Sequence, residues 1–67
     1  MTLGRIGAVL KKLREAKGLS QQALSKKAKV TGAYIAMLET GVRNNPTIDT
    51  LKRLAKALDV PVGELLK

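Results

Sequence analysis

The sequence predicts an all-α fold of five short helices in one small domain, and three observations lead to this prediction. Apolar residues recur at spacings of three and four, as on one face of an amphipathic helix. Residues that favour helix N-caps stand before these stretches, and glycine or proline stands after them. No stretch has the alternating pattern of a strand, and no repeat or linker divides the chain. We therefore expect a single domain over residues 1–67.

The composition limits the function of this domain. Its 67 residues carry 13 Lys and Arg against 5 Asp and Glu, a formal charge of +8. Such a surplus attracts polyanions and is typical of nucleic-acid binding, although lysine also suits any solvated helix face. The single aromatic residue, Tyr34, argues against a platform for single strands, which needs several stacking rings.

Several other classes of protein are disfavoured. The chain has no Cys and no His, so it lacks disulfides, thiolate ligands and the commonest general base and zinc ligand. We expect no catalytic site, no metal and no cofactor. No apolar run approaches the ~20 residues of a membrane span, and the first residues lack the continuous apolar core that is typical of a signal peptide. A cytoplasmic protein is the expectation, and the initial Met1 suggests a whole small protein.

The first predicted helix spans residues 3–17. Its apolar stripe consists of Leu3, Ile6, Leu10 and Leu13. Thr2 is a candidate N-cap, and Gly18 supplies the residue that ends the helix. Gly4 and Gly7 weaken the first turns by up to about 1 kcal/mol each.

Residues 20–39 predict two short helices joined by a tight turn. Ser20 and Thr31 are good N-caps, each before a run of helix formers. Apolar residues occupy one face of each helix and the corner between them: Leu24 and Ala28, Ile35 and Leu38, and Val30. Two helices packed through such a corner form a helix-turn-helix, whose second helix can enter the DNA major groove.

The rest of the chain predicts a loop and two further helices. Residues 41–47 contain Gly, two Asn and Pro, and form the loop. Thr47 then caps a helix with the apolar stripe Ile48, Leu51, Leu54, Ala55 and Leu58. Pro61 opens a last short helix that contains Val62, Leu65 and Leu66.

Taken in order, these segments resemble a known family. The matching segments are LREAKGLSQ at 13–21, YI at 34–35, LETG at 38–41, PT at 46–47, Leu51, LA at 54–55, LDV at 58–60 and LL at 65–66. They are similar to the Cro/C1-type (XRE) helix-turn-helix family, the lambda-repressor-like domain of phage repressors and small bacterial regulators. The resemblance covers the chain from about residue 5 and implies an intracellular bacterial, archaeal or phage regulator that binds double-stranded DNA as a dimer.

The resemblance also implies roles for individual residues. Gln21 matches a position that contacts a backbone phosphate and supports the reading helix. Arg14 and Glu39 match a buried salt bridge that ties the first helix to the third. The third helix is then the reading helix, with Gly32, Ala33, Ala36 and Met37 pointing outward and Tyr34 on its flank.

Other candidate DNA contacts surround that helix. None of its outward residues is the Arg, Gln or Asn expected to read base edges, so Thr31, Ala33 and Met37 offer at best contacts to thymine methyl groups. The Tyr34 hydroxyl could reach a phosphate or a base edge. Specificity is then expected from DNA shape and dimer spacing. The loop adds phosphate donors in Arg43, Asn44 and Asn45.

Two features keep alternatives open. Lys29 stands where the motif's turn usually has Gly, which indicates either local strain of roughly 1 kcal/mol or a phosphate contact. Near the C-terminus, Val60, Val62, Leu65 and Leu66 either cover the core or form a dimer patch, or do both.

The leading hypothesis is a sequence-specific transcriptional regulator, in the first instance a repressor acting as a homodimer. The apolar face of the third helix supports an alternative, a protein-interaction module such as an antitoxin or a coactivator-like adaptor. Sequence selectivity in DNA binding separates the two hypotheses. An enzyme has no support from the residues present, and a membrane-active peptide would need one long amphipathic helix.

Overall fold

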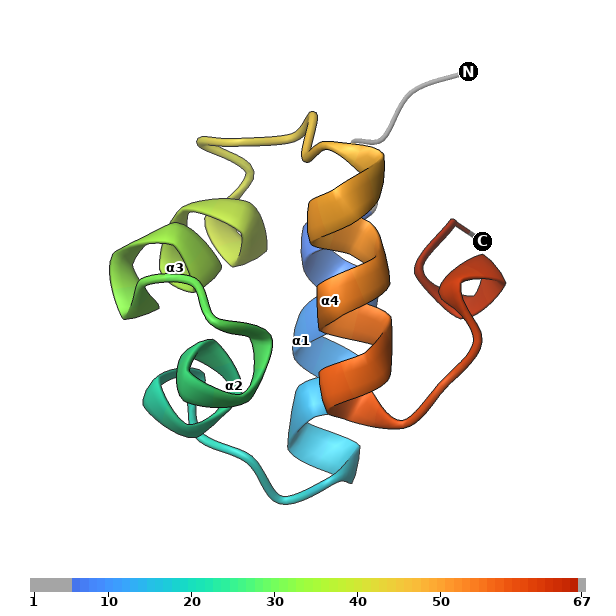
Figure 1. Cartoon of the computed structure of the whole chain (residues 1–67). Helices are drawn as coiled ribbons and strands as arrows, with labels where there is room; N and C mark the ends of the chain where they lie inside the picture. The colour runs from blue at the N-terminus through green and yellow to red at the C-terminus, as the bar shows by residue number, and fades with distance from the viewer. Residues whose placement is uncertain (1–5, 67) are drawn as a thin grey trace.

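The computed structural model describes residues 6–66 and shows four α-helices followed by a 3-10 helix (Figure 1). The elements are α1 (Ile6–Ala16), α2 (Gln21–Ala28), α3 (Gly32–Thr40), α4 (Ile48–Leu58) and η1 (Val62–Leu66). The all-α prediction is confirmed, with a 3-10 helix where a fifth α-helix was expected. The predicted roles of Thr2, Leu3 and Gly4 lie outside the described residues.

Three helices begin at the predicted caps. The side chains of Ser20, Thr31 and Thr47 each accept a hydrogen bond from the backbone N–H three residues later. Each of these residues has extended backbone angles, so the helix starts directly after it. Local side-chain chemistry therefore sets the starts of α2, α3 and α4.

The helices end in left-handed residues. Gly18 and Gly41 have φ values of 71° and 86°, as their predicted role in stopping α1 and α3 requires. Lys29 and Asp59 adopt the same region with φ of 59° and 58°, at the ends of α2 and α4. The strain expected at Lys29 is consistent with its positive φ, whereas the positive φ of Asp59 was not expected from the sequence.

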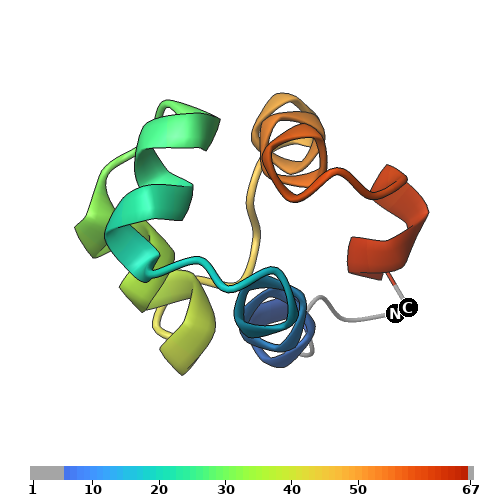
Figure 2. The same cartoon turned by 90° about the horizontal axis from the view of Figure 1, so that it is seen from below.

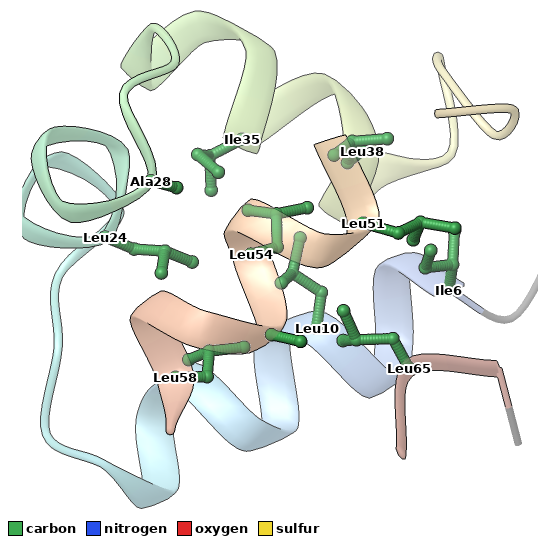
Figure 3. Packing of buried hydrophobic residues seen from close by; sticks show 11 residues of the cluster. Ile6, Leu10, Leu24, Ala28, Ile35, Leu38, Leu51, Leu54, Leu58 and Leu65 are labelled. Atoms are coloured by element: carbon green, nitrogen blue, oxygen red, sulfur yellow. The ribbon is translucent and has the colours of Figure 1, made fainter. Parts of the chain in front are cut away.

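The helices form a closed ring around one core. Going round the ring, α1 packs on α3, α3 on α2, α2 on α4, α4 on η1, and η1 back on α1 (Figure 2). Leucine and isoleucine side chains from every element fill its interior (Figure 3). The members exposed by 1% or less include Leu10, Leu24, Ile35, Leu38, Leu51, Leu54, Leu58 and Leu65.

One prediction about packing was wrong, and one close approach was not foreseen. Ile48 was assigned to the apolar stripe of α4, but it is the first residue of that helix and is 65% exposed. Gly7 was expected only to weaken α1. It is instead buried where α1 crosses α3, and a Cβ there would collide with the carbonyl oxygen of Leu38.

Within the described range, no helix is long and apolar enough to cross a bilayer.

Candidate nucleic-acid interface

A buried ion pair joins α1 to α3. The guanidinium of Arg14 donates from Nε to Oε2 of Glu39 at 2.6 Å and from Nη2 to Oε1 at 3.0 Å. Nη1 donates to the backbone carbonyl of Leu19 at 2.7 Å. The side chains of Arg14 and Glu39 are only 10% and 3% exposed. The predicted structural salt bridge is confirmed, and its two-pronged geometry is the strongest that Arg and a carboxylate form.

Gln21 extends this pair to a third helix. Its Nε2 donates to Oε1 of Glu39 at 3.0 Å, from the first residue of α2. Glu39 thus receives side-chain hydrogen bonds from α1 and from α2, and holds the C-terminal half of α3 against both. The network therefore fixes the position of this end of α3 relative to α1 and α2.

The network also shifts the pKa values of its two ionised groups. Burial opposes ionisation of Glu39, but hydrogen bonds from Arg14 and Gln21 outweigh burial and lower the pKa of Glu39 below its ordinary value of 4.5. The hydrogen bond to Glu39 raises the pKa of Arg14. Both groups are therefore charged at neutral pH.

No buried side-chain N or O atom in the part of the chain described here lacks a hydrogen-bond partner.

The outward face of α3 is small and uncharged. Ala33 is exposed, whereas Gly32, Tyr34, Ala36 and Met37 are half-buried. Tyr34 packs against the edge of the core, in agreement with its predicted place on the flank. Because Gly32 and Ala33 carry almost no side chain, the first turn of α3 can approach another surface closely, backbone first.

The loop after α3 lies beside that helix. The N–H of Arg43 donates to the carbonyl of Met37 at 3.0 Å, which ties the loop back to α3. The side chains of Arg43, Asn44 and Asn45 are exposed, and Pro46 is buried. The buried proline, which sequence reasoning did not single out, anchors the loop so that its three polar residues face solvent together.

The remaining charged residues decorate the other helices. Lys26 and Lys27 are exposed on the last turn of α2, and Lys52, Arg53 and Lys56 are exposed on α4. Arg53 lies 3.0 Å from Asp49, one turn earlier on the same helix. Over residues 6–66, no group of three Asp or Glu side chains is placed to hold a metal ion.

A groove between α2 and α4 was not foreseen from the sequence. It measures about 490 Å³ and is lined by Lys27, Ala28, Lys29, Arg53, Lys56 and Ala57. Its walls come from residues 24 or more positions apart in the chain. The pattern on each helix alone resembles an ordinary solvated face, so no signal in the sequence could have indicated the groove.

The candidate dimer patch divides into two parts. Leu65 is 1% exposed and belongs to the core, and Val60 packs against that core. Val62 and Leu66 are 36% and 38% exposed on η1. The role in covering the core is therefore confirmed for Leu65 and Val60, and Leu65 is not available to a partner. The dimer patch stays a prediction, with Val62 and Leu66 as its exposed members.

Known proteins are similar to this chain in sequence and in fold. A family model described as "Helix-turn-helix" matches residues 10–65. The HTH-type transcriptional regulator SinR of Bacillus subtilis is 38% identical over 61 residues. That match covers 91% of this chain but 55% of SinR, so the chain spans about half the length of this relative.

Solved structures agree over nearly the whole chain. The restriction-modification controller protein C.AhdI from Aeromonas hydrophila superposes with a TM-score of 0.88 at 38% identity, covering 94% of each chain. SinR, the master regulator for biofilm formation, has been crystallised in complex with DNA. That structure has a TM-score of 0.89 at 37% identity and covers 92% of this chain and 98% of that one. The chain belongs to the Cro/C1-type helix-turn-helix family of DNA-binding domains.

Proposed function

We propose that this chain binds double-stranded DNA sequence-specifically and regulates transcription, as a repressor that occupies an operator as a homodimer. The likeness to SinR in complex with DNA carries the proposal, because that match covers 92% of this chain with a TM-score of 0.89. The formal charge of +8 supplies the attraction to phosphate that such binding needs. A repressor of this kind works in the cytoplasm, where the DNA of a bacterium, archaeon or phage lies.

The proposed reading surface consists of α3 and its two borders. Thr31, Gly32, Ala33, Tyr34 and Met37 are proposed to face the major groove, where Thr31, Ala33 and Met37 offer apolar contacts to thymine methyl groups. Thr31 also has its hydroxyl oxygen engaged in capping α3, so its methyl group is the part offered to a base.

Phosphate contacts on either side position the helix. The amide nitrogen of Gln21 has two N–H groups, and one is bound to Glu39, so the second is proposed to donate to a phosphate. On the other side, Arg43, Asn44 and Asn45 are proposed to follow the backbone. Lys29 has a positive φ, which costs backbone strain, and its side chain lines the groove between α2 and α4. We therefore propose no phosphate contact for Lys29.

The proposed dimer uses the apolar surface of η1. Val62 and Leu66 are the exposed members, and Val60 adjoins them in the chain. We propose that an isologous contact through this surface sets the spacing of the two α3 helices on the DNA.

Selection from a random duplex library near physiological salt tests this proposal. We expect enrichment of an inverted repeat whose half-sites lie about one helical turn apart. Binding without an enriched motif, which fades steeply as salt rises, would contradict it, because only the phosphate contribution would then be present. In that case the alternative function, an adaptor or antitoxin that binds a protein through the apolar face of α3, would explain the binding data better.

A further inference from the structure

The groove between α2 and α4 is strongly basic. Four of its six lining residues are cations, namely Lys27, Lys29, Arg53 and Lys56, and none is acidic. We propose that this groove docks an acidic segment of a partner protein, whose carboxylates pair with these cations. The proposal does not depend on DNA binding, because it concerns another surface of the ring.

The lining indicates what kind of partner fits. Ala28 is buried and Ala57 is half-buried, so the floor is small and apolar and allows a peptide to approach closely. The cations are exposed, and a single exposed ion pair contributes little. A chain that carries several carboxylates engages several cations at once, because each contact after the first is intramolecular. These features favour an acidic segment over an isolated small anion.

Nucleic acid fits this groove less well. A single strand needs aromatic rings for its bases, and Tyr34, the only aromatic residue, does not line the groove. A duplex is expected at α3, and α2 separates α3 from α4 in the ring (Figure 2). Arg53 and Lys56 on α4 therefore stay open to a second partner while α3 faces DNA.

One cation of the groove already has a neighbour. Arg53 lies 3.0 Å from Asp49, with side chains that are 49% and 72% exposed. A pair this exposed is weak, so an incoming carboxylate exchanges with Asp49 at little cost. The three lysines supply the remaining attraction.

The test uses a fluorescein-labelled peptide of repeating Glu-Glu-Ala units and a Gln-Gln-Ala peptide as the neutral control. Binding is measured by fluorescence anisotropy near physiological salt, and its location by amide chemical shifts of the ¹⁵N-labelled chain. The variant Lys27→Glu/Lys56→Glu reverses two charges of the groove. The matched variant Lys12→Glu/Lys17→Glu reverses two exposed charges of the same sign near the C-terminal half of α1. Circular dichroism melting verifies that both variants are folded.

The proposal predicts saturable shifts at residues 27–29 and 53–57 with the acidic peptide only. The groove variant is expected to weaken binding by about tenfold, and the α1 variant by less than about threefold. Equal weakening by both variants, or shifts spread over all lysines, would overturn it. So would inorganic tripolyphosphate bound as tightly as the peptide, or a DNA duplex that shifts Arg53 and Lys56 in the peptide's place.

Discussion

Two contacts of the helical ring, α1 with α3 and α2 with α4, use positive charge in opposite ways. Between α1 and α3 the backbones meet at Gly7, and the charges of Arg14 and Glu39 are matched and buried. Between α2 and α4 a groove of about 490 Å³ stays open, and its cations exceed the one carboxylate, Asp49, that pairs with them. The contact between α1 and α3 is closed and therefore holds the fold together. The contact between α2 and α4 is open and leaves charge available for binding.

The largest effect on stability is expected from Gly7→Ala, which would break the closed contact between α1 and α3. A Cβ in Gly7→Ala would collide with the carbonyl of Leu38 and lie 3.1 Å from the Cα of Glu39, both backbone atoms that cannot rotate away. We expect a loss of more than about 3 kcal/mol in the free energy of unfolding, despite the better helix propensity of Ala. Urea denaturation measures it. In the control Gly32→Ala the added Cβ would lie 3.9 Å from Ser25 Oγ, an ordinary contact, so stability should change by less than about 1 kcal/mol. Equal effects of the two substitutions would contradict this account.

The second-largest loss of stability is expected when one partner of the buried ion pair is removed. Glu39→Ala leaves Arg14 charged, buried and without its carboxylate, and takes the acceptor of Gln21 away. We expect destabilisation by about 3 kcal/mol, as for other uncompensated buried charges. An unchanged melting temperature would show that the pair does not hold α1 to α3.

The same pair predicts a pH dependence. The pKa of Glu39 is lowered by folding, so its contribution to stability is complete above its ordinary value of 4.5 and is lost as pH falls below that value through the folded pKa. Thermal melting from neutral to acidic pH should therefore show a steeper decline for the native chain than for Glu39→Gln. Parallel curves would mean that Glu39 does not contribute to the acid sensitivity.

A smaller effect of opposite sign is expected at the open contact. Lys29 ends α2 with φ of 59°, a conformation that favours glycine. Lys29→Gly should stabilise the fold by about 0.5–1 kcal/mol in urea denaturation. Lys27→Gly, within α2, is the control and should destabilise by about 1 kcal/mol. Destabilisation by both variants would show that the Lys29 side chain contributes more than its backbone costs.

The exposed ion pair should have the smallest effect. Asp49→Asn removes the partner of Arg53 where both side chains are largely exposed, so stability should change by less than about 0.5 kcal/mol. Melting in low and high salt measures it. A loss of stability as large as that of Glu39→Ala would contradict the claim that the two helix contacts use charge differently.

Local chemistry made much of the fold predictable. Ser20, Thr31 and Thr47 cap helices because their side chains accept bonds from nearby N–H groups, and Gly18 and Gly41 end helices because they tolerate positive φ. These effects act within a few residues, so a sequence pattern reveals them.

What escaped prediction depends on long-range packing. Gly7 has its role because α3 crosses α1 there, and the exposure of Ile48, the first residue of α4, is set by which neighbours the folded chain brings to it. The Arg14–Glu39 pair was expected by resemblance to a family, and 25 positions separate its members. The groove between α2 and α4 had no comparable template, since it arises only when the ring closes.

The most direct test of the central claim is amide chemical-shift mapping of the ¹⁵N-labelled chain with a duplex obtained from the selection. The account predicts the largest shifts at Gln21, in residues 31–37 and in residues 43–45, while Arg53 and Lys56 on α4 stay unchanged. Shifts concentrated on the lysines of α1 or α4, with α3 unperturbed, would contradict the claim that α3 is the reading helix.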